Sequence, residues 1–352
     1  MDTNPYTDTV DLLGVIATAP TAPNFFLDRY FRGDNRLSVK EEISFDEVLE
    51  GLPVMAPYVF PEVAGKAQSG QGYQTKVFRP AYLKPKNILK PKDSIKRRPG
   101  EPLTGELSPE RRRDLALIDL LEYQKSSIMT RLEYMAARAL IDGKVKIEGE
   151  NYPTQIVDFC RDPNNTVYIS NANDKWSNDK ADIASQLEDF SNQILQKSGS
   201  AATDIIMSPA VWKAFKANKS ILAEADLRRG ITNIPNLTPQ ADVGIGAQYK
   251  GEYGSFSIFV YARSFREQNG EDISVLADNE ILAVARPDET GKGGVEGVKA
   301  FGAILDHESL TPIDLFPKTW VQQDPSGLFV MTQSAPLMIP GRPNATLKAT
   351  VL

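Results

Sequence analysis

The stretch that decides the fold begins at residue 79 and reads RPAYLKPKNILKPKDSIKRRPGE through residue 101. It is dense in lysine and arginine and holds four prolines. Because proline cannot donate to an interior ladder, this stretch is expected on a sheet edge or in an extended arm. From residue 76 to residue 113 the net charge is +8, whereas the chain of 352 residues carries −6. We call residues 79–101 the basic strip.

A long helix is predicted directly after the basic strip. Ser108 is a suitable N-cap, Pro109 suits the first turn, and Gly143 can end the helix. Apolar residues at helical spacing then predict one buried face. These residues are Leu115, Ile118, Leu121, Ile128, Leu132, Met135 and Ala139. A rise of about 1.5 Å per residue makes this helix about 50 Å long, and its simplest interpretation is a core helix of an α+β protein.

The segment before the basic strip is acidic and extended. Residues 1–62 carry a net charge of −7, and the aromatic cluster NFFLDRYF at 24–31 predicts an arm that docks through a few anchors. From Val54 to Tyr82 the pattern favours extended chain, with Gly70 and Gly72 at a loop tip. Together with the basic strip, this pattern predicts a long hairpin that its own subunit covers poorly.

The rest of the chain alternates between helix and strand patterns. Helices are predicted at 179–199 and 209–218, and the tail from 318 onward alternates as strands do. Further strands are predicted at 203–209, 256–262, 272–277 and 280–285.

Composition excludes several classes of site. Because the chain has one cysteine, Cys160, and one histidine, His307, it has no internal disulfide, no zinc cluster and no site with two imidazoles. Cys160 is interpreted as a small buried hydrophobic residue and His307 as a satisfied or exposed one. The glycine-rich stretches at 244–251 and 290–297 do not fit phosphate-binding motifs and are interpreted as turns. No apolar run reaches the roughly 18 residues of a membrane span, and the acidic N-terminus is unlike a secretion signal. We therefore expect no metal, no cofactor, no membrane partner and no enzymatic activity.

Other functions can be argued from the charge pattern. A nucleic-acid-binding protein would use the basic residues of 76–113, with Phe78 and Tyr82 available to stack on bases. The negative charge of the whole chain and the lack of a recognised motif disfavour that interpretation. A hydrolase that uses two carboxylates is a weaker alternative, because no spacing singles out a pair. An ordinary solvated face would also explain the charges.

A set of strings in fixed order is similar to the lambda-type major capsid proteins of tailed bacteriophages. They are the basic strip with Phe78, the long helix, DLRRG at 226–230, YKGEYG at 249–254, LADN at 276–279, PKTWV at 317–321 and QSAPLM at 333–338. The similarity runs from about Asn24 to Met338, which is most of the chain. No single string is specific, but the collinear set is.

The resemblance implies an α+β fold of the Hong Kong 97 capsid type. Its parts would be an N-terminal arm at 1–50, an extended loop at 51–104, a peripheral domain with a spine helix at 105–177, an axial domain at 178–300 and return strands at 301–352. It also implies a structural head subunit, present in the virion and assembled in the host cytoplasm. Such subunits form hexamers and pentamers of an icosahedral shell that encloses DNA.

The resemblance also implies partners. These would be further copies of the chain, a decoration protein, the portal, and packaged double-stranded DNA bound without sequence specificity. A separate scaffolding protein is expected, because a few dozen residues precede the extended loop. Some relatives join subunits through lysine and asparagine, but lambda-type shells resemble the unlinked kind, so no cross-link site is assigned.

The basic strip then has an explanation. A segment that its own subunit does not cover can be covered by the next copy in a ring. The acidic N-terminal segment of that copy is the complementary surface, and the charges would set register and partner choice. The residues expected at this contact are Tyr73, Arg79, Lys84, Lys86, Lys90, Lys92, Arg97 and Arg98.

Overall fold

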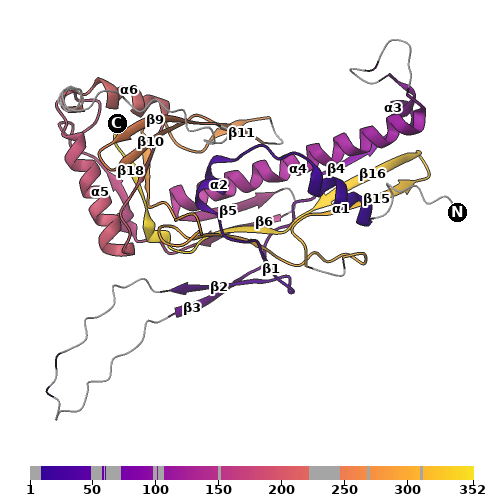
Figure 1. The fold of residues 1–352 in the computed structure, drawn as a ribbon, viewed down its shortest axis with the longest axis horizontal. Coiled ribbons are helices and arrows are strands. Elements are labelled where there is room, and N and C mark those ends of the chain that lie inside the picture. The colour runs from indigo at the N-terminus through magenta and orange to yellow at the C-terminus, as the bar shows by residue number, and fades with distance from the viewer. Residues whose placement is uncertain are drawn as a thin grey trace.

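The structure is a computed structural model. It describes residues 9–48, 58, 60, 73–97, 101, 107–149, 152–221, 246–267, 270–309 and 312–352. Figure 1 shows an elongated body with one long helix along it and a strand pair that projects away from it. The expected loop tip at Gly70 and Gly72, the string at 226–230 and the contact residue Arg98 lie outside the described residues.

The long helix is α4, Pro109–Asp142, as predicted. The Ser108 hydroxyl accepts the Arg111 N–H at 3.2 Å, and Gly143 ends the helix in the left-handed conformation at φ 66°. The buried face is formed by Leu117, Leu121, Gln124, Ile128, Leu132, Glu133, Met135, Ala136, Ala137, Ala139, Leu140 and Ile141. Leu115 and Ile118 are only half-buried, so their assignment to the core was wrong. The stripe continues from Leu121 to Leu117 by a step of four residues, and it passes through a polar residue, Gln124.

A three-stranded sheet covers one side of α4. Its order is β15, β16, β4, with every pair antiparallel. The bounds are Phe316–Gln322 for β15, Gly327–Gln333 for β16 and Lys86–Leu89 for β4. A short helix, α3 (Pro91–Ile95), follows β4 and packs on α4. The basic strip therefore runs along the body of its own subunit.

The other end of the body is a larger sheet (Figure 1). Among the described residues six strands form it, in the order β7, β18, β13, β8, β10, β9. Their bounds are Thr166–Tyr168, Thr346–Thr350, Glu280–Val284, Asp204–Met207, Phe256–Tyr261 and Ala247–Tyr253. Helices α5 (Ile183–Ser198) and α6 (Pro209–Ala217) flank this sheet. The helices and the β8, β10 and β13 strands predicted here are confirmed.

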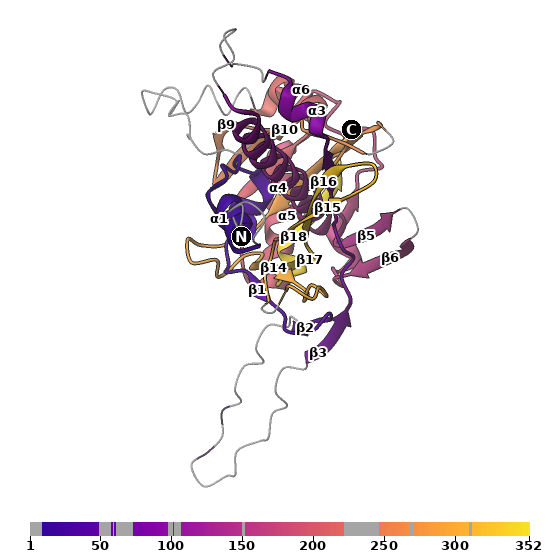
Figure 2. The same ribbon diagram turned by 90° about the vertical axis from the view of Figure 1, so that its right-hand side faces the viewer.

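Smaller strand groups connect these layers. Strand β1 (Arg36–Leu37) joins β14 (Gly297–Phe301), which pairs with β17 (Pro336–Pro340). The remaining pairs are β5 (Lys144–Gly149) with β6 (Tyr152–Asp158), β11 (Ser264–Arg266) with β12 (Asp272–Ser274), and β2 (Ile43–Val48) with β3 (Tyr73–Phe78). Short 3-10 turns lie at Pro163–Asn165 and Pro343–Ala345. Figure 2 shows β2 and β3 leaving the body on the side opposite α6.

The N-terminal segment contains two helices that the sequence analysis did not predict. They are α1, Thr9–Thr18, and α2, Phe25–Tyr30. The aromatic cluster supplies the predicted anchors: Phe25, Phe26, Tyr30 and Phe31 are all buried. Phe25 meets Phe26 edge to face at 5.1 Å and lies 5.2 Å from Phe259 of the large sheet. The cluster thus joins the N-terminal segment to the core.

Within the described part of the chain, no helix combines the length and the apolar character that a membrane span requires.

Candidate subunit interface

The projecting strand pair, β2 and β3, begins nearer the N-terminus than the extended pattern from Val54 onward predicted. β2 and β3 pair antiparallel from Ile43 opposite Phe78 to Val48 opposite Tyr73. Its first strand therefore belongs to the first 50 residues, before the extended pattern that begins at Val54. At its base, Phe45 contacts the ring of Phe159 with centroids 6.0 Å apart. Tyr73, an expected contact residue, begins β3.

The basic strip is bound to its own subunit along one edge. Leu83 and Ser334 exchange two backbone hydrogen bonds, at 2.8 and 3.0 Å, and β4 continues the pairing with β16. The expectation that the strip has no covering segment in its own subunit is therefore wrong. Pro85 and Pro91 lie on either side of β4 and limit the strand to four residues, because proline has no N–H to donate. These four residues pair with β16 along one edge of β4.

Four of the expected contact residues are lysines of the strip. Lys84, Lys86, Lys90 and Lys92 are all exposed, as expected, and none of them forms an ion pair with a described residue. Lys84 Nζ lies over the Tyr82 ring at 4.6 Å, and Lys86 Nζ lies over the Phe329 ring at 5.0 Å. The pairing with β16 therefore positions the backbone that carries these exposed lysines, which have no ion-pair partner among the described residues.

Two arginines of the strip have partners within the subunit. Arg79 forms an ion pair with Glu41, so one basic residue already meets the acidic N-terminal segment of its own chain. Arg97 donates to the carbonyl of Glu101. The Glu41 carboxylate partly compensates the charge of Arg79, whereas Arg97 keeps its charge because its partner is a neutral carbonyl.

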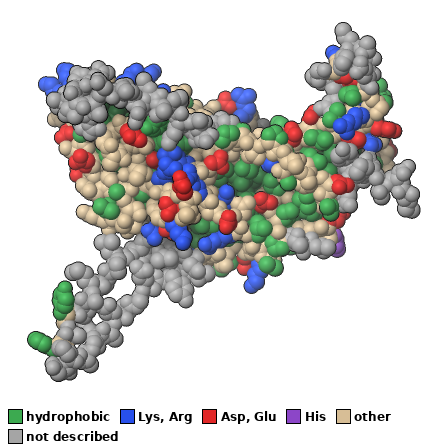
Figure 3. All heavy atoms as spheres, viewed as in Figure 1, with side chains coloured by type: hydrophobic (Ala, Val, Ile, Leu, Met, Phe, Trp, Pro, Cys, Tyr) green, Lys and Arg blue, Asp and Glu red, His purple; other side chains and the backbone are tan. Residues whose placement is uncertain are grey.

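A buried ion pair, which the sequence analysis did not predict, joins the last residue of the strip to α4. Arg112, in the first turns of α4, binds the Glu101 carboxylate at 2.6 Å, and the carboxylate is 1% exposed. Arg112 also donates to the carbonyl of Ile95 at the end of α3. Figure 3 shows basic and acidic side chains close together at this end of the molecule. The available signal was an acidic residue, Glu101, at the end of a basic run.

The aromatic residues of the strip do not form a stacking surface for bases. The Tyr82 hydroxyl donates to the carbonyl of Ala303 at 3.0 Å, and Lys84 covers its ring. Phe78 is half-buried and packs on the hydrophobic core. Bases stack on open aromatic faces, so this arrangement does not favour nucleic-acid recognition by the strip.

The glycine-rich stretch at 290–297 is a closed turn, as predicted. The carboxylate oxygen Oδ1 of Asp288 accepts the N–H groups of Thr290 and Lys292 at 2.9 and 2.8 Å, and the Thr290 hydroxyl at 2.7 Å. A phosphate-binding loop needs such N–H groups to be free. Here the chain's own carboxylate occupies them.

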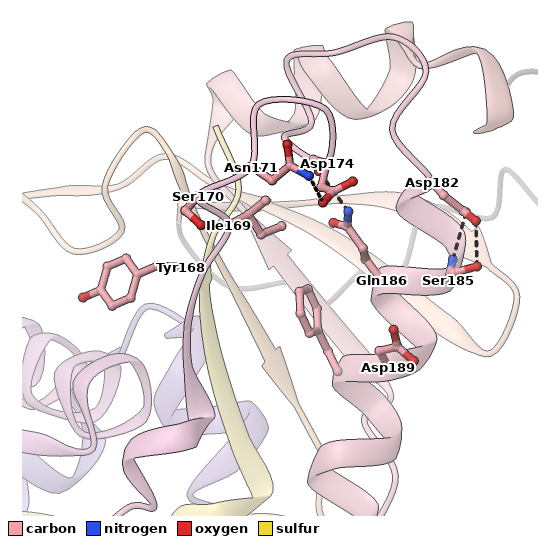
Figure 4. Close-up of a pocket in the computed structure, with 10 residues that line it drawn as sticks. Tyr168, Ile169, Ser170, Asn171, Asp174, Asp182, Ser185, Gln186 and Asp189 are labelled. Atoms are coloured by element: carbon pink, nitrogen blue, oxygen red, sulfur yellow. Dashed lines mark hydrogen bonds between the residues drawn. The ribbon is translucent and has the colours of Figure 1, made fainter.

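A polar hollow lies between the end of β7 and α5 (Figure 4). Its side chains bind one another: Asn171 Nδ2 donates to Asp174 at 2.9 Å, and Asp182 accepts both the N–H and the hydroxyl of Ser185. Gln186 donates to the Asp174 carbonyl at 2.9 Å. A hydrolase of this kind needs two carboxylates directed at a substrate. Asp174 and Asp182 serve local turns, which leaves Asp189 as one exposed carboxylate in the lining. No group of three His, Cys, Asp or Glu side chains in the described residues could hold a metal ion.

Cys160 is not buried, which corrects the prediction. It is exposed, has φ 55°, and its Sγ lies 2.7 Å from Lys76 Nζ. The chain turns sharply just after β6, so the apolar run that ends at Cys160 stops one residue earlier, at buried Phe159. His307 is exposed in a turn, as expected.

Comparison with known proteins agrees with this architecture. The family model described as phage major capsid protein E matches residues 8–351. The chain belongs to this family. It is 30% identical to a prophage-derived major head protein of Escherichia coli over 94% of this chain and 95% of that protein. It is also 30% identical to the major capsid protein of Escherichia phage lambda, covering 91% of each.

A solved capsid protein of an Escherichia coli prophage has the same fold. It superposes with a TM-score of 0.73 at 20% identity, over 98% of this capsid protein and 99% of that chain. The Hong Kong 97-type fold is therefore confirmed, with α4 as its spine helix. The protein is a structural, non-enzymatic subunit of a phage or prophage head, and it self-assembles into the shell of the virion.

Proposed function

We propose that this capsid subunit forms hexamers and pentamers of an icosahedral shell around double-stranded DNA, and that the lysines of the basic strip contact the next copy in the ring. The division into an arm at 1–50, an extended loop at 51–104, a peripheral domain at 105–177 and 301–352, and an axial domain at 178–300 belongs to this proposal. Membership in the capsid family supports the assembly into a shell.

The observation that carries the contact is the row of four lysines on a fixed support. β4 is the last strand in the order β15, β16, β4, so its second edge is open among the described strands. An open edge can accept another chain, and Lys84, Lys86, Lys90 and Lys92 lie on or next to β4 without an ion-pair partner among the described residues. An acidic segment of a neighbouring copy fits both features. The exposed acidic residues within 1–62, a range with a net charge of −7, would form that segment.

Further partners follow from the family resemblance. We propose a separate scaffolding protein, a decoration protein on the shell and a portal at one vertex. Packaged DNA would meet the inner surface without sequence specificity, and the net charge of −6 would keep that contact weak. Assembly would take place in the host cytoplasm.

The test is charge reversal of the four lysines. In the variant Lys84→Glu, Lys86→Glu, Lys90→Glu and Lys92→Glu, like charges meet across the contact, which costs several kcal/mol if the contact excludes water. Because the four side chains are exposed in the subunit, folding should be unchanged. We expect wild-type circular dichroism and melting temperature, but no rings or shells in negative-stain micrographs.

The matched control reverses four other exposed lysines, Lys144, Lys213, Lys216 and Lys292, which form no ion pair with described residues. Both variants change the net charge equally, so a general charge effect would impair both. Normal assembly of the strip variant at low salt contradicts the proposed contact. Unfolding of the strip variant shows that the lysines serve the subunit itself.

A further inference from the structure

Two charged side chains of the spine helix hold the N-terminal helices. Lys125 Nζ donates to the carbonyls of Ile16 and Ala19, at 2.8 and 2.7 Å, where α1 ends. Two helical turns further along, the Glu133 carboxylate accepts the N–H groups of Phe26 and Leu27, both at 2.9 Å, where α2 begins. We call residues 9–31 the arm segment. The spine helix thus binds it at two places, with one cation and one carboxyl group.

The two holding groups differ in their surroundings. Glu133 is 0% exposed and forms no ion pair with a described residue. The groups that face it are Asp28 of α2, Tyr261 of β10, and Arg263, which follows β10. The Arg263 guanidinium is occupied elsewhere, because it donates to Asn24 Oδ1 at 3.1 Å and to Thr130 Oγ1 at 3.4 Å. The carboxyl group of Glu133 therefore lies in the core with backbone N–H groups as its main partners.

Burial without a paired cation disfavours the ionised form. Removal from water raises the pKa of Glu133 to about 7, although the two N–H bonds and Arg263 pull it downward. The neutral acid keeps one of the two N–H acceptors in its carbonyl oxygen. Its hydroxyl gives up the other and can donate instead to the buried Tyr261 oxygen, which has no hydrogen-bond partner among the described residues. Both protonation states of Glu133 are thus available near neutral pH.

We propose that Glu133 is a proton-controlled latch for the arm segment, which a protonated Glu133 holds against the spine helix more tightly than an ionised one does. When the arm segment leaves, the carboxyl group faces water and regains its ordinary pKa of 4.5. The docked state therefore binds the proton more tightly than the open state does. Docking is strongest below the open-state pKa, weakens as pH rises toward the docked-state pKa, and is constant well above it.

This linkage fixes the size of the effect. With pKa values of 4.5 and about 7 for the open and docked states, the opening constant should rise roughly 40-fold between pH 5 and pH 7 and about twofold more by pH 8. Lys125 donates to two carbonyl oxygens, which take up no proton near neutral pH. We therefore expect the effect of replacing Lys125 to be the same at every pH.

Hydrogen exchange of the full-length subunit tests the latch. The amides of Phe26 and Leu27 report arm opening, and those of Ile205 and Ile206 in β8 report the body, each corrected for its intrinsic exchange rate. We expect the corrected opening of the arm amides to rise with pH as calculated, while the β8 amides do not follow. Glu133→Gln should abolish the pH dependence of the arm amides. Lys125→Met should increase opening by the same factor at every pH.

The matched control is Glu110→Gln, on an exposed site of the same helix, which should keep the wild-type profile. Arm amides without pH dependence in the wild-type protein overturn the proposal. An equal pH dependence of exchange in the arm amides and the β8 amides also overturns the proposal, because both would then report global unfolding. If Glu133→Gln does not fold, the carboxyl titration of wild-type Glu133 by nuclear magnetic resonance decides: titration near pH 7 supports the latch, and titration below pH 5.5 overturns it.

Discussion

The Gln124 side chain, inside the apolar face of the spine helix, donates from Nε2 to Asn87 Oδ1 at 2.8 Å. Asn87 belongs to β4, so this bond joins the spine helix to the basic strip. The same amide group donates to the carbonyl of Val330 at 2.9 Å and accepts the Thr332 hydroxyl at 2.7 Å. Gln124 and Thr332 are both 0% exposed. A buried polar network therefore fixes where β4 lies against β16.

We expect Gln124→Leu to lower the free energy of unfolding by about 2 to 4 kcal/mol, because each buried group left without a partner costs about 1 to 3 kcal/mol. Asn87→Ala should cost less, since Asn87 is half-buried and water can replace it. Denaturant unfolding followed by circular dichroism measures both. A Gln124→Leu protein as stable as the wild type would show that the network has no net energetic role.

The corrected apolar face of α4 predicts a graded response to truncation. Leu121 is 0% and Ile128 2% exposed, so Leu121→Ala and Ile128→Ala should each cost about 2 to 5 kcal/mol. Ile118→Ala is the control, because the sequence placed Ile118 in the same stripe but the side chain is only partly buried. It should cost roughly 1 kcal/mol. Equal losses in all three variants contradict the burial pattern.

Elements with local signals were predictable from the sequence. α4, α5 and α6 each begin at a capping residue, Ser108, Asp182 and Ser208, whose side chain accepts a backbone N–H. α4 and α5 end at glycines with positive φ. Such signals lie within a few residues of the boundary they set. Near the start of α4 the buried residue is Leu117, and the predicted Leu115 and Ile118 are only half-buried. The polar residue Gln124 interrupts the apolar pattern of the buried face, which made its course harder to predict.

Elements that depend on distant partners were not predictable. β4 is recognisable as an edge segment from its flanking prolines, but its partner β16 lies more than 200 residues further along the chain, and local pattern does not specify it. At the candidate contact, the exposure of the four lysines was predictable, because charged side chains are rarely buried without a partner. The Arg79–Glu41 ion pair and the burial of Glu101 by Arg112 are tertiary contacts, which a single sequence does not encode locally.

Neither single-copy reactive side chain should matter for assembly. His307 and Cys160 are both exposed, and the contact of Cys160 Sγ with Lys76 Nζ lies at the surface. We expect His307→Ala and Cys160→Ala to change the free energy of unfolding by less than about 0.5 kcal/mol. Shell formation, scored by negative-stain microscopy, should be normal. A folded variant that fails to form shells would show that one of these residues acts in assembly.

The last prediction concerns the contact between α2 and the large sheet. Arg29 binds Asp204 of β8 through two bonds, Nε at 2.5 Å and Nη2 at 3.0 Å, and the Tyr30 hydroxyl donates to the same carboxylate at 2.8 Å. The Asp204 side chain is 1% exposed. Removing one partner of a buried pair leaves the other charge without compensation, which costs about 3 to 5 kcal/mol. Asp204→Asn should therefore destabilise the subunit by this amount, and Tyr30→Phe by about 1 kcal/mol.

The chain offers a control with the same geometry and different burial. Arg266 binds Asp272 through Nε at 2.9 Å and Nη2 at 3.0 Å, but the two side chains are 73% and 48% exposed. Asp272→Asn should cost no more than about 1 kcal/mol, since water screens this pair. The double variant Arg29→Met with Asp204→Asn should recover part of the loss, because no buried charge then lacks a partner. Equal melting temperatures for Asp204→Asn and Asp272→Asn would show that burial does not set the strength of this contact, and that α2 is held to the sheet by its aromatic residues alone.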